Sequence, residues 1–296
     1  MSLNIKLMLG AGGVFLTIVI AAIYLTAFQL FIANRVAAFQ GFQLHPSIPY
    51  GTTPEQQLDI YQPQTKSDEL LPVVVFFYGG CWGACATMKK EQYAFVAEAF
   101  SSTKMIAVVA DYRLYPQVNF PDIMADAGRA VEWVNKNIVA YGGDSQRIFL
   151  MGHSSGAHMA AMLAVNPQHL LPDTYKNIKG FVGLAGPYNF LPFDEDYMPI
   201  LFGPPMQVVE SQPVHFVDGS EPPSLLLYGA DDTRVKAVNI EGMAARIQQA
   251  GGEVEVHIYK DVDHAGIVGA FSVLFRQKKP AFSDTVNFIQ KHSVRD

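Results

Sequence analysis

The sequence predicts an α/β fold in which a mostly parallel sheet carries helices on both faces. Short apolar runs of strand composition alternate along the chain with longer helical stretches, which is the pattern of a sheet with crossover helices. Most of these runs are apolar at every position, as expected for parallel strands covered on both sides. With 296 residues, 50% of them hydrophobic, the chain can build a sizeable core, so a disordered chain is excluded.

The individual elements follow from composition and periodicity. Four continuous apolar runs are expected to form buried strands, and the alternating stretch 253–259 is expected to form a strand with one exposed face. Helices are expected between the strands, and Gly251 and Gly252 end the last of them. The buried runs are 73–78, 106–110, 148–151 and 225–228, and the helical stretches are 122–140, 155–165 and 238–250.

Charge and cysteine content exclude several functions. The chain has 21 Lys and Arg residues against 27 Asp and Glu residues, a formal charge of -6, so it lacks the basic footprint that binds a phosphate backbone. No nucleic-acid partner is expected. Two cysteines, Cys81 and Cys85, are too few for a disulfide framework and lack the paired spacing of a zinc site. No metal or other cofactor is implied, and the oligomeric state is left open.

A long uncharged stretch stands near the start of the chain. From Leu7 to Asn34 there is no Asp, Glu, Lys or Arg. About 20 apolar helical residues suffice to cross a bilayer, so residues 14–33 are predicted to form a transmembrane helix within a membrane anchor at residues 1–40. The remainder, residues 41–296, is predicted to be one domain.

This stretch predicts a single-pass membrane protein. Lys6 and Arg35, on either side of it, give almost no orientation signal, and we expect the larger domain to be extracytoplasmic. The alternative is secretion after cleavage of a signal peptide, because residues 36–38 offer small side chains near a possible cut.

The strongest chemical signal follows the third buried run. Residues 152–156 read Gly-His-Ser-Ser-Gly and fit the G-x-S-x-G pattern between a strand and a helix. A serine at such a sharp turn is pushed out of the sheet, and the amino terminus of the next helix supplies positive potential. Ser154 is therefore the expected nucleophile, whereas Ser155 is not centred between the glycines.

A serine nucleophile needs a histidine as its base. Among eight histidines, His264 is favoured because it lies in a loop after a strand, near the carboxyl end of the sheet where open α/β folds place their sites. His153 and His158 belong to the turn around Ser154 and to its helix, where we expect packed or capping roles.

The acid that orients the base is expected in the loop after the strand 225–228. Asp231 and Asp232 both lie there, and Asp232 is the preferred residue. The chain order Ser154, Asp232, His264 is then the order of the nucleophile-elbow fold.

Backbone donors for an oxyanion are expected after the first buried run, where residues 78–83 read Tyr-Gly-Gly-Cys-Trp-Gly. Glycines allow backbone amides to converge on one oxygen in the transition state. We assign the amides of Gly80, Cys81 and Ser155 to this oxyanion hole. In this arrangement Cys81 contributes its backbone and not its sulfur.

A small cap insertion is expected at residues 186–224, before the strand that carries the acid. Its eight prolines oppose a long amphipathic lid helix. Its aromatic residues can still form a compact apolar wall, which favours a short acyl group or an aromatic group over a long chain.

Several segments together resemble the α/β-hydrolase serine esterases close to the hormone-sensitive-lipase-like carboxylesterases. The similarity covers residues 58–264. The segments are residues 111–116 with Phe120, Pro121 and Asp126, residues 141–148, and residues 229–235, which are similar to the H-G-x-x-D-x-x-V acid loop of that family. The last similarity favours Asp232 over Asp231, and the resemblance as a whole implies the α/β-hydrolase fold.

The sequence departs from that pattern in three of its motif elements. Tyr78 and Tyr228 replace histidines of the H-G-G and acid-loop motifs, and Cys81-Trp82 replaces the third glycine. The last change resembles the H-G-G-x-W of kynurenine formamidases, isoprenylcysteine methylesterases and bacterial feruloyl-esterase-like proteins. The residues of the triad are untouched.

These features predict a membrane-anchored serine hydrolase that cleaves a carboxylic ester of a small molecule through an acyl-enzyme. An amidase such as an arylformamidase is the alternative within the same fold, because a triad alone does not select the leaving group. A non-catalytic protein that keeps the fold as a binding module is the alternative from another class.

Overall fold

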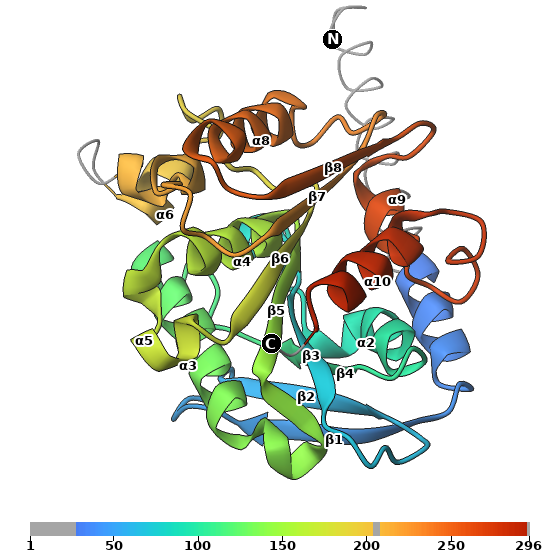
Figure 1. Cartoon of the computed structure of the whole chain (residues 1–296). Helices are drawn as coiled ribbons and strands as arrows, with labels where there is room; N and C mark the ends of the chain where they lie inside the picture. The colour runs from blue at the N-terminus through green and yellow to red at the C-terminus, as the bar shows by residue number, and fades with distance from the viewer. Residues whose placement is uncertain (1–27, 204–207, 295–296) are drawn as a thin grey trace, which may run out of the picture.

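The computed structural model describes residues 28–203 and 208–294 of the chain. Eight strands form one sheet in the order β1-β2-β4-β3-β5-β6-β7-β8 (Figure 1). β2 pairs antiparallel with both of its neighbours, whereas the pairings from β4 through β3 to β8 are all parallel. The strands are β1 Phe42–Pro49, β2 Gln57–Pro63, β3 Leu71–Phe77, β4 Ile106–Ala110, β5 Gly143–His153, β6 Ile178–Leu184, β7 Ser224–Gly229 and β8 Val254–Tyr259.

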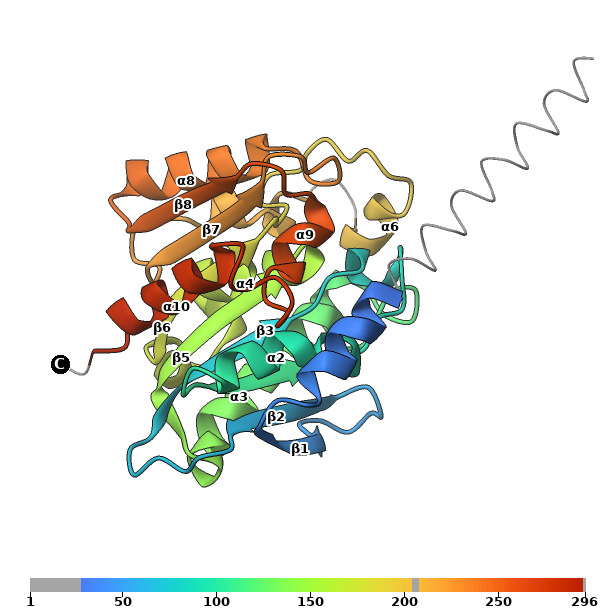
Figure 2. The same ribbon diagram turned by 90° about the vertical axis from the view of Figure 1, so that its right-hand side faces the viewer.

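Helices cover both faces of this sheet. α3 and α4 lie on one face, and α2 and α10 lie on the other (Figures 1 and 2). The helices are α2 Ala94–Ser101, α3 Phe120–Asn137, α4 Ser155–Val165, α5 Pro172–Tyr175, α6 Met198–Phe202, α8 Val238–Ala250, α9 His264–Gly269 and α10 Ala281–Lys291. The mostly parallel sheet with helices on both faces confirms the predicted fold class.

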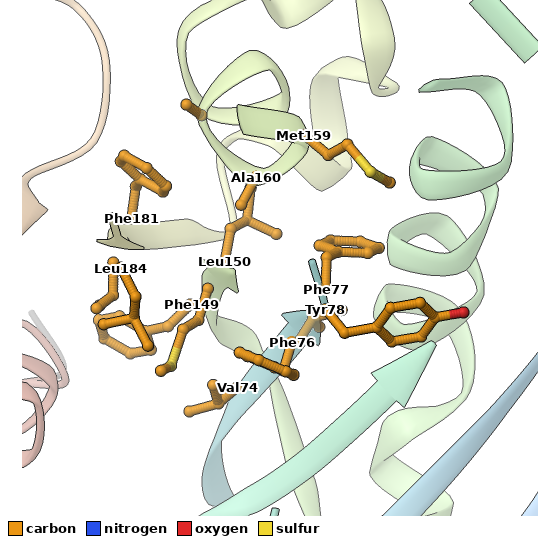
Figure 3. Packing of buried hydrophobic residues seen from close by; sticks show 14 of the residues in the cluster. Val74, Phe76, Phe77, Tyr78, Phe149, Leu150, Met159, Ala160, Phe181 and Leu184 are labelled. Atoms are coloured by element: carbon orange, nitrogen blue, oxygen red, sulfur yellow. The ribbon is translucent and has the colours of Figure 1, made fainter. Parts of the chain in front are cut away.

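The core is packed where β3 and β5 lie side by side. Val74 pairs with Phe149 in register, and both side chains are fully buried. Figure 3 shows Val74 on one side of the sheet and Phe77 on the other, beside Met159 of α4. Consecutive apolar residues are therefore needed in β3 because each face of the sheet packs against a helix.

The predicted location in a membrane is corrected by the structure. Among residues 28–203 and 208–294, no helix has both the length and the apolar character needed to cross a bilayer. Most of the predicted transmembrane segment, residues 14–27, lies outside the described residues.

The described end of that segment packs against protein. Residues 28–37 are helical, and Leu30 and Ala33 pack against the core. The Asn34 side chain donates to the Gln92 carbonyl at 2.8 Å and accepts from the Phe95 amide at 3.0 Å. This packing covers only part of the helix, because Phe28 and Phe31 are 61% and 58% exposed. Sequence alone does not distinguish apolar residues that pack on the domain from apolar residues that contact lipid.

Asp126 on α3 is hydrogen-bonded to two other parts of the chain, at Gln56 and at Arg113. Its carboxylate, which is fully buried, accepts a bidentate pair of hydrogen bonds from Arg113 at 2.8 Å each and one from Gln56 at 2.6 Å. The Arg113 segment continues to Tyr115, whose amide donates to the Trp82 carbonyl at 2.9 Å. Asp126 therefore supports the loop that follows β3.

We expect Asp126→Ala to lower the free energy of unfolding by about 3 kcal/mol, because it strips a buried ion pair of one partner. Asp122→Ala is the matched control: its carboxylate is half exposed and lies 3.8 Å from the same guanidinium, so a change below about 0.5 kcal/mol is expected. Urea unfolding measures both values. Equal losses in the two variants would contradict this role of Asp126.

Candidate active site

The turn between β5 and α4 holds Ser154 in a conformation that few residues adopt. Its φ is 56° and its ψ is -124°. The Ser154 amide donates to the Leu184 carbonyl of β6 at 2.9 Å, and its carbonyl accepts from the His158 amide at 3.1 Å. The backbone is thus fixed on both sides of a residue whose conformation is strained, which is typical of a functional position.

The two glycines of the G-x-S-x-G pattern are required by close backbone contacts. A Cβ on Gly152 would lie 2.2 Å from the Gly156 carbonyl oxygen, and a Cβ on Gly156 would lie 2.1 Å from the carbonyl oxygen of Phe77 in β3. Neither position has room for a side chain. The turn can therefore press against β3 and its following loop only with glycine at both positions.

Asp232 and His264 are brought together from loops that follow adjacent strands. His264 is the first residue of α9, and its Nδ1 donates to the Asp232 Oδ2 at 2.7 Å. The other oxygen, Oδ1, accepts from the amides of Arg234 at 2.8 Å and Val235 at 3.0 Å. Asp231, by contrast, is exposed.

These contacts keep Asp232 ionised. Burial would raise its pKa, but the hydrogen bonds from His264 and from the two amides outweigh this effect and lower the pKa below the ordinary value. A carboxylate held this way fixes the proton of His264 on Nδ1 and leaves Nε2 as the basic nitrogen. No hydrogen bond between described residues joins His264 to Ser154; such bonds often form only when substrate is bound.

His153 makes a contact that the sequence did not predict. Its Nε2 donates to the backbone carbonyl of His264 at 2.8 Å, and the two rings lie 4.7 Å apart. Burial, followed by the nearby charge of His264, lowers the pKa of His153 to about 3, so its ring is neutral. The residue before Ser154 therefore holds the backbone of His264, beyond the packed role expected of it. Its partner is a main-chain atom distant in sequence, so no sequence signal could have indicated the contact.

The predicted oxyanion donors lie on segments that surround the turn. A Cβ on Gly79 would lie 3.0 Å from the Cβ of Ser154, so the loop after β3 passes directly beside that serine. Cys81 begins the short helix η1 Cys81–Gly83, and Ser155 begins α4. The first amides of a helix have no intrahelical acceptor, which leaves them available for an anion.

Cys81 and Cys85 form a disulfide within this loop, with their Cα atoms 5.3 Å apart. Their pairing was not predicted, because two cysteines were too few to indicate a framework. The Arg234 guanidinium nitrogen Nη2 lies 3.5 Å from the Cys85 sulfur and 3.8 Å from the Cys81 sulfur. The disulfide, in the loop after β3, thus contacts the loop after β7 that carries Asp232.

The two tyrosines that replace histidines of the esterase pattern both bond to backbone or acid partners. Tyr78 donates its hydroxyl to Asp111 at 2.7 Å, and Tyr228 donates to the Val235 carbonyl at 2.7 Å, which closes the acid loop. The Tyr228 hydroxyl thus holds the loop that presents Asp232.

Aromatic side chains of residues 186–202 gather over Trp82. Its ring lies 4.9 Å from Phe202 and 5.9 Å from Phe190. Trp82 donates its indole N–H to the Nδ1 of His158 at 3.3 Å, and the Nε2 of His158 donates to the Ser211 carbonyl at 2.7 Å. Burial lowers the pKa of His158 to about 4, so its ring is neutral. The ring joins Trp82, in the loop after β3, to the backbone of Ser211.

One group of acidic and histidine side chains lies away from the His264–Asp232 pair. Among the described residues, the one group of three or more that could share an ion is Glu253, Glu255 and His292, at the start of β8 and just after the end of α10. The Lys291 ammonium already bonds both carboxylates, at 2.8 and 2.7 Å.

The fold places the chain among the α/β-hydrolases, with the elbow serine and the His264–Asp232 pair at the carboxyl ends of the strands. The family model described as BD-FAE matches residues 58–246, more than half of the chain. The chain therefore belongs to the BD-FAE family.

Named relatives are esterases and a formamidase. The chain is 29% identical over 260 residues to an isoprenylcysteine alpha-carbonyl methylesterase of Arabidopsis thaliana, a match that covers 80% of this chain and 60% of the relative. It is 28% identical over 262 residues to esterase LipQ of Mycobacterium tuberculosis, covering 82% and 62%. Kynurenine formamidase of Salmo salar is 29% identical over 160 residues, covering 51% and 49%. The chain thus spans less than two thirds of the length of these relatives.

Solved structures share the fold. Esterase 2 of Thermogutta terrifontis superposes with a TM-score of 0.68 at 23% identity, covering 85% of this chain and 94% of that one. A truncated carbohydrate esterase from gut microbiota superposes with a TM-score of 0.69 at 18% identity, covering 86% and 97%. These similarities establish the α/β-hydrolase fold for this chain.

Proposed function

We propose that this chain is a serine carboxylesterase that cleaves small carboxylic esters through an acyl-enzyme. The observation that carries the proposal is the 2.7 Å hydrogen bond between His264 and the buried Asp232, beside the elbow that presents Ser154. Esterase names among the relatives support the same reaction class.

In the proposed reaction the Ser154 hydroxyl attacks the ester carbonyl while His264 Nε2 takes its proton. Asp232 stabilises the imidazolium that forms, and the oxygen of the tetrahedral intermediate accepts from the amides of Gly80, Cys81 and Ser155. The C–O bond then breaks, and His264 protonates the departing alcohol. Water attacks the acyl-serine by the same route in reverse, which releases the acid and restores Ser154.

A fluorophosphonate probe tests the proposal directly, because the probe bonds only to an activated serine. We expect stoichiometric labelling of the purified chain at Ser154, located by peptide mass spectrometry, and loss of ester hydrolysis in proportion to labelling. An unlabelled chain that retains its fold would favour the non-catalytic binding module instead.

An arylformamidase activity is the second candidate. The likeness to kynurenine formamidase and the Gly79-Gly80-Cys81-Trp82 segment favour it. A matched pair of substrates with the same aromatic ring, one a formanilide and one a phenyl ester, separates the two activities. We expect a higher kcat/KM on the ester.

We expect higher kcat/KM on acetyl to hexanoyl nitrophenyl esters than on the palmitoyl ester. We propose that residues 186–224 act as a compact cap, and the rings of Phe190, Phe193 and Phe202 pack on one another there. Each further methylene of an acyl chain gains about 0.8 kcal/mol only where the pocket has room to bury it.

Kinetics across the acyl series, with and without detergent micelles, measure this preference. A maximum at long chains that appears when micelles are present would show that the aromatic wall opens to admit a lipid chain, and would overturn the short-acyl preference.

A further inference from the structure

The loop that carries two of the proposed oxyanion donors has four consecutive residues with positive φ. The angles are 127° at Gly80, 54° at Cys81, 57° at Trp82 and 107° at Gly83. Residues with a Cβ adopt this region at a cost in free energy. An unrestrained Cys81-Trp82 segment would therefore relax to negative φ, so other contacts must hold the loop in its present shape.

One restraint is noncovalent and acts on the second half of the loop. The buried indole of Trp82 bonds to His158, and the Trp82 carbonyl accepts from the Tyr115 amide at 2.9 Å. A Cβ on Gly83 would lie 2.5 Å from the Tyr115 carbonyl oxygen, so Gly83 is also pressed against this segment. These contacts fix Trp82 and Gly83, and the Gly83 amide donates at 3.0 Å to the Gly80 carbonyl, which shares a peptide group with the Cys81 amide.

The second restraint is covalent and acts on Cys81 itself. The disulfide joins it to Cys85, and the same turn is closed by a hydrogen bond from the Cys85 amide to the Gly80 carbonyl at 3.3 Å. The bond therefore ties Cys81, inside the positive-φ segment, to a residue two positions beyond its end. It fixes the residue whose amide is a proposed oxyanion donor.

This disulfide is open to chemistry from solution. Cys85 is exposed, so a thiol can reach its sulfur. The Arg234 guanidinium lies beside both sulfurs, and a cation there favours the thiolate, which is the form that leaves in thiol–disulfide exchange.

We propose that the Cys81–Cys85 disulfide is a positioning element of the oxyanion hole, so that the rate of hydrolysis depends on whether this bond is closed. The proposal rests on the proposed esterase function. When a dithiol supplies two electrons and two protons, the S–S bond breaks, two thiols form on the chain, and the dithiol closes to a cyclic disulfide. The freed Cys81 amide then turns from the oxyanion, which raises the barrier to the tetrahedral intermediate but leaves ester binding unchanged.

The test compares the oxidised full chain with the chain reduced by excess dithiothreitol, on a short-acyl nitrophenyl ester. Removal of one oxyanion donor costs about 100-fold or more in kcat; because a loosened donor is only partly lost, we expect kcat to fall by about 10- to 100-fold on reduction, with KM changed by less than about two-fold. Reoxidation should restore kcat. A trifluoromethyl ketone, which mimics the tetrahedral intermediate, should lose affinity by the same factor as kcat.

Variants separate this role from simple stabilisation. Cys85→Ser and the double variant Cys81→Ser/Cys85→Ser should show the low kcat of the reduced chain and no response to dithiothreitol. All assays are run well below the melting temperature of each form, so a disulfide that only stabilises the fold would lower Tm and leave kcat unchanged.

Two results would overturn the proposal. The first is a reduced chain, with two thiols found by titration, that keeps kcat within about two-fold of the oxidised chain. The second is an oxidised chain that neither hydrolyses esters nor reacts with a fluorophosphonate, because then the esterase function fails and this proposal fails with it.

Discussion

Ser154→Ala should abolish ester hydrolysis, with a fall in kcat/KM of at least about 1,000-fold. The hydroxyl is the proposed site of covalent attack, so its loss removes the nucleophile. The side chain is half buried, so its loss leaves no large cavity, and the free energy of unfolding should change by less than about 1 kcal/mol.

Initial rates on a nitrophenyl ester and a urea unfolding curve measure the two effects together. Ser283→Ala on α10 is the matched control, because it removes an exposed hydroxyl far along the chain and should leave both values unchanged. His264→Ala should lose nearly as much activity as Ser154→Ala. Activity within a few-fold of the parent chain in either variant would remove that residue from the mechanism.

Asp232→Asn should lower kcat by about 1,000-fold or more, because an amide cannot stabilise the imidazolium and can hold His264 in the wrong tautomer. Asp231→Asn is the matched control: the residue is adjacent and exposed, and its amide, which donates to the Val262 carbonyl at 3.0 Å, is kept. We expect a change of a few-fold at most.

Steady-state kinetics of the two variants on one ester decide between the aspartates. A severe loss in Asp231→Asn with a mild one in Asp232→Asn would assign the acid to Asp231. Fluorophosphonate labelling of Asp232→Asn should slow in parallel with kcat, since the same base activates Ser154 for both reactions.

Most of the strands that sequence alone predicted are buried on both faces, and the exception, β8, was predicted from its alternating pattern. β3, β4 and β7 show as continuous apolar runs because helices pack on each side. β6 gave no such run because glycines interrupt it. The packing requires them: a Cβ on Gly180 would lie 2.9 Å from the rings of Phe149 and Phe288, and one on Gly183 would lie 1.9 Å from the Tyr188 hydroxyl.

Strand β1, at the edge of the sheet, was not predicted, for a different reason. β1 has no buried residue, and its partly exposed positions do not alternate with its exposed ones, so no apolar pattern marks it. The helix at residues 28–37 led to an error of the opposite kind, because the composition of Leu30 and Ala33 does not show whether they contact lipid or pack, as they do, against their own domain.

Within the site, the sequence predicted the local motifs but not the contacts between residues that are distant in the chain. The G-x-S-x-G turn fixes its own backbone, so the sequence indicated Ser154 directly. The Cys81–Cys85 bond depends on the left-handed backbone between the two cysteines, and the spacing of four residues does not specify that conformation. Tyr228 and His153 bond to backbone carbonyls, which carry no side-chain identity for a sequence pattern to detect.

The bond from His153 to the His264 carbonyl couples two parts of the site mechanically. His153 is joined to Ser154 by one peptide bond, so a displacement of the β5–α4 turn pulls on α9 and carries the His264 backbone with it. The distance between the proposed nucleophile and base therefore depends on one peptide bond and one hydrogen bond, from Ser154 through His153 to the His264 backbone.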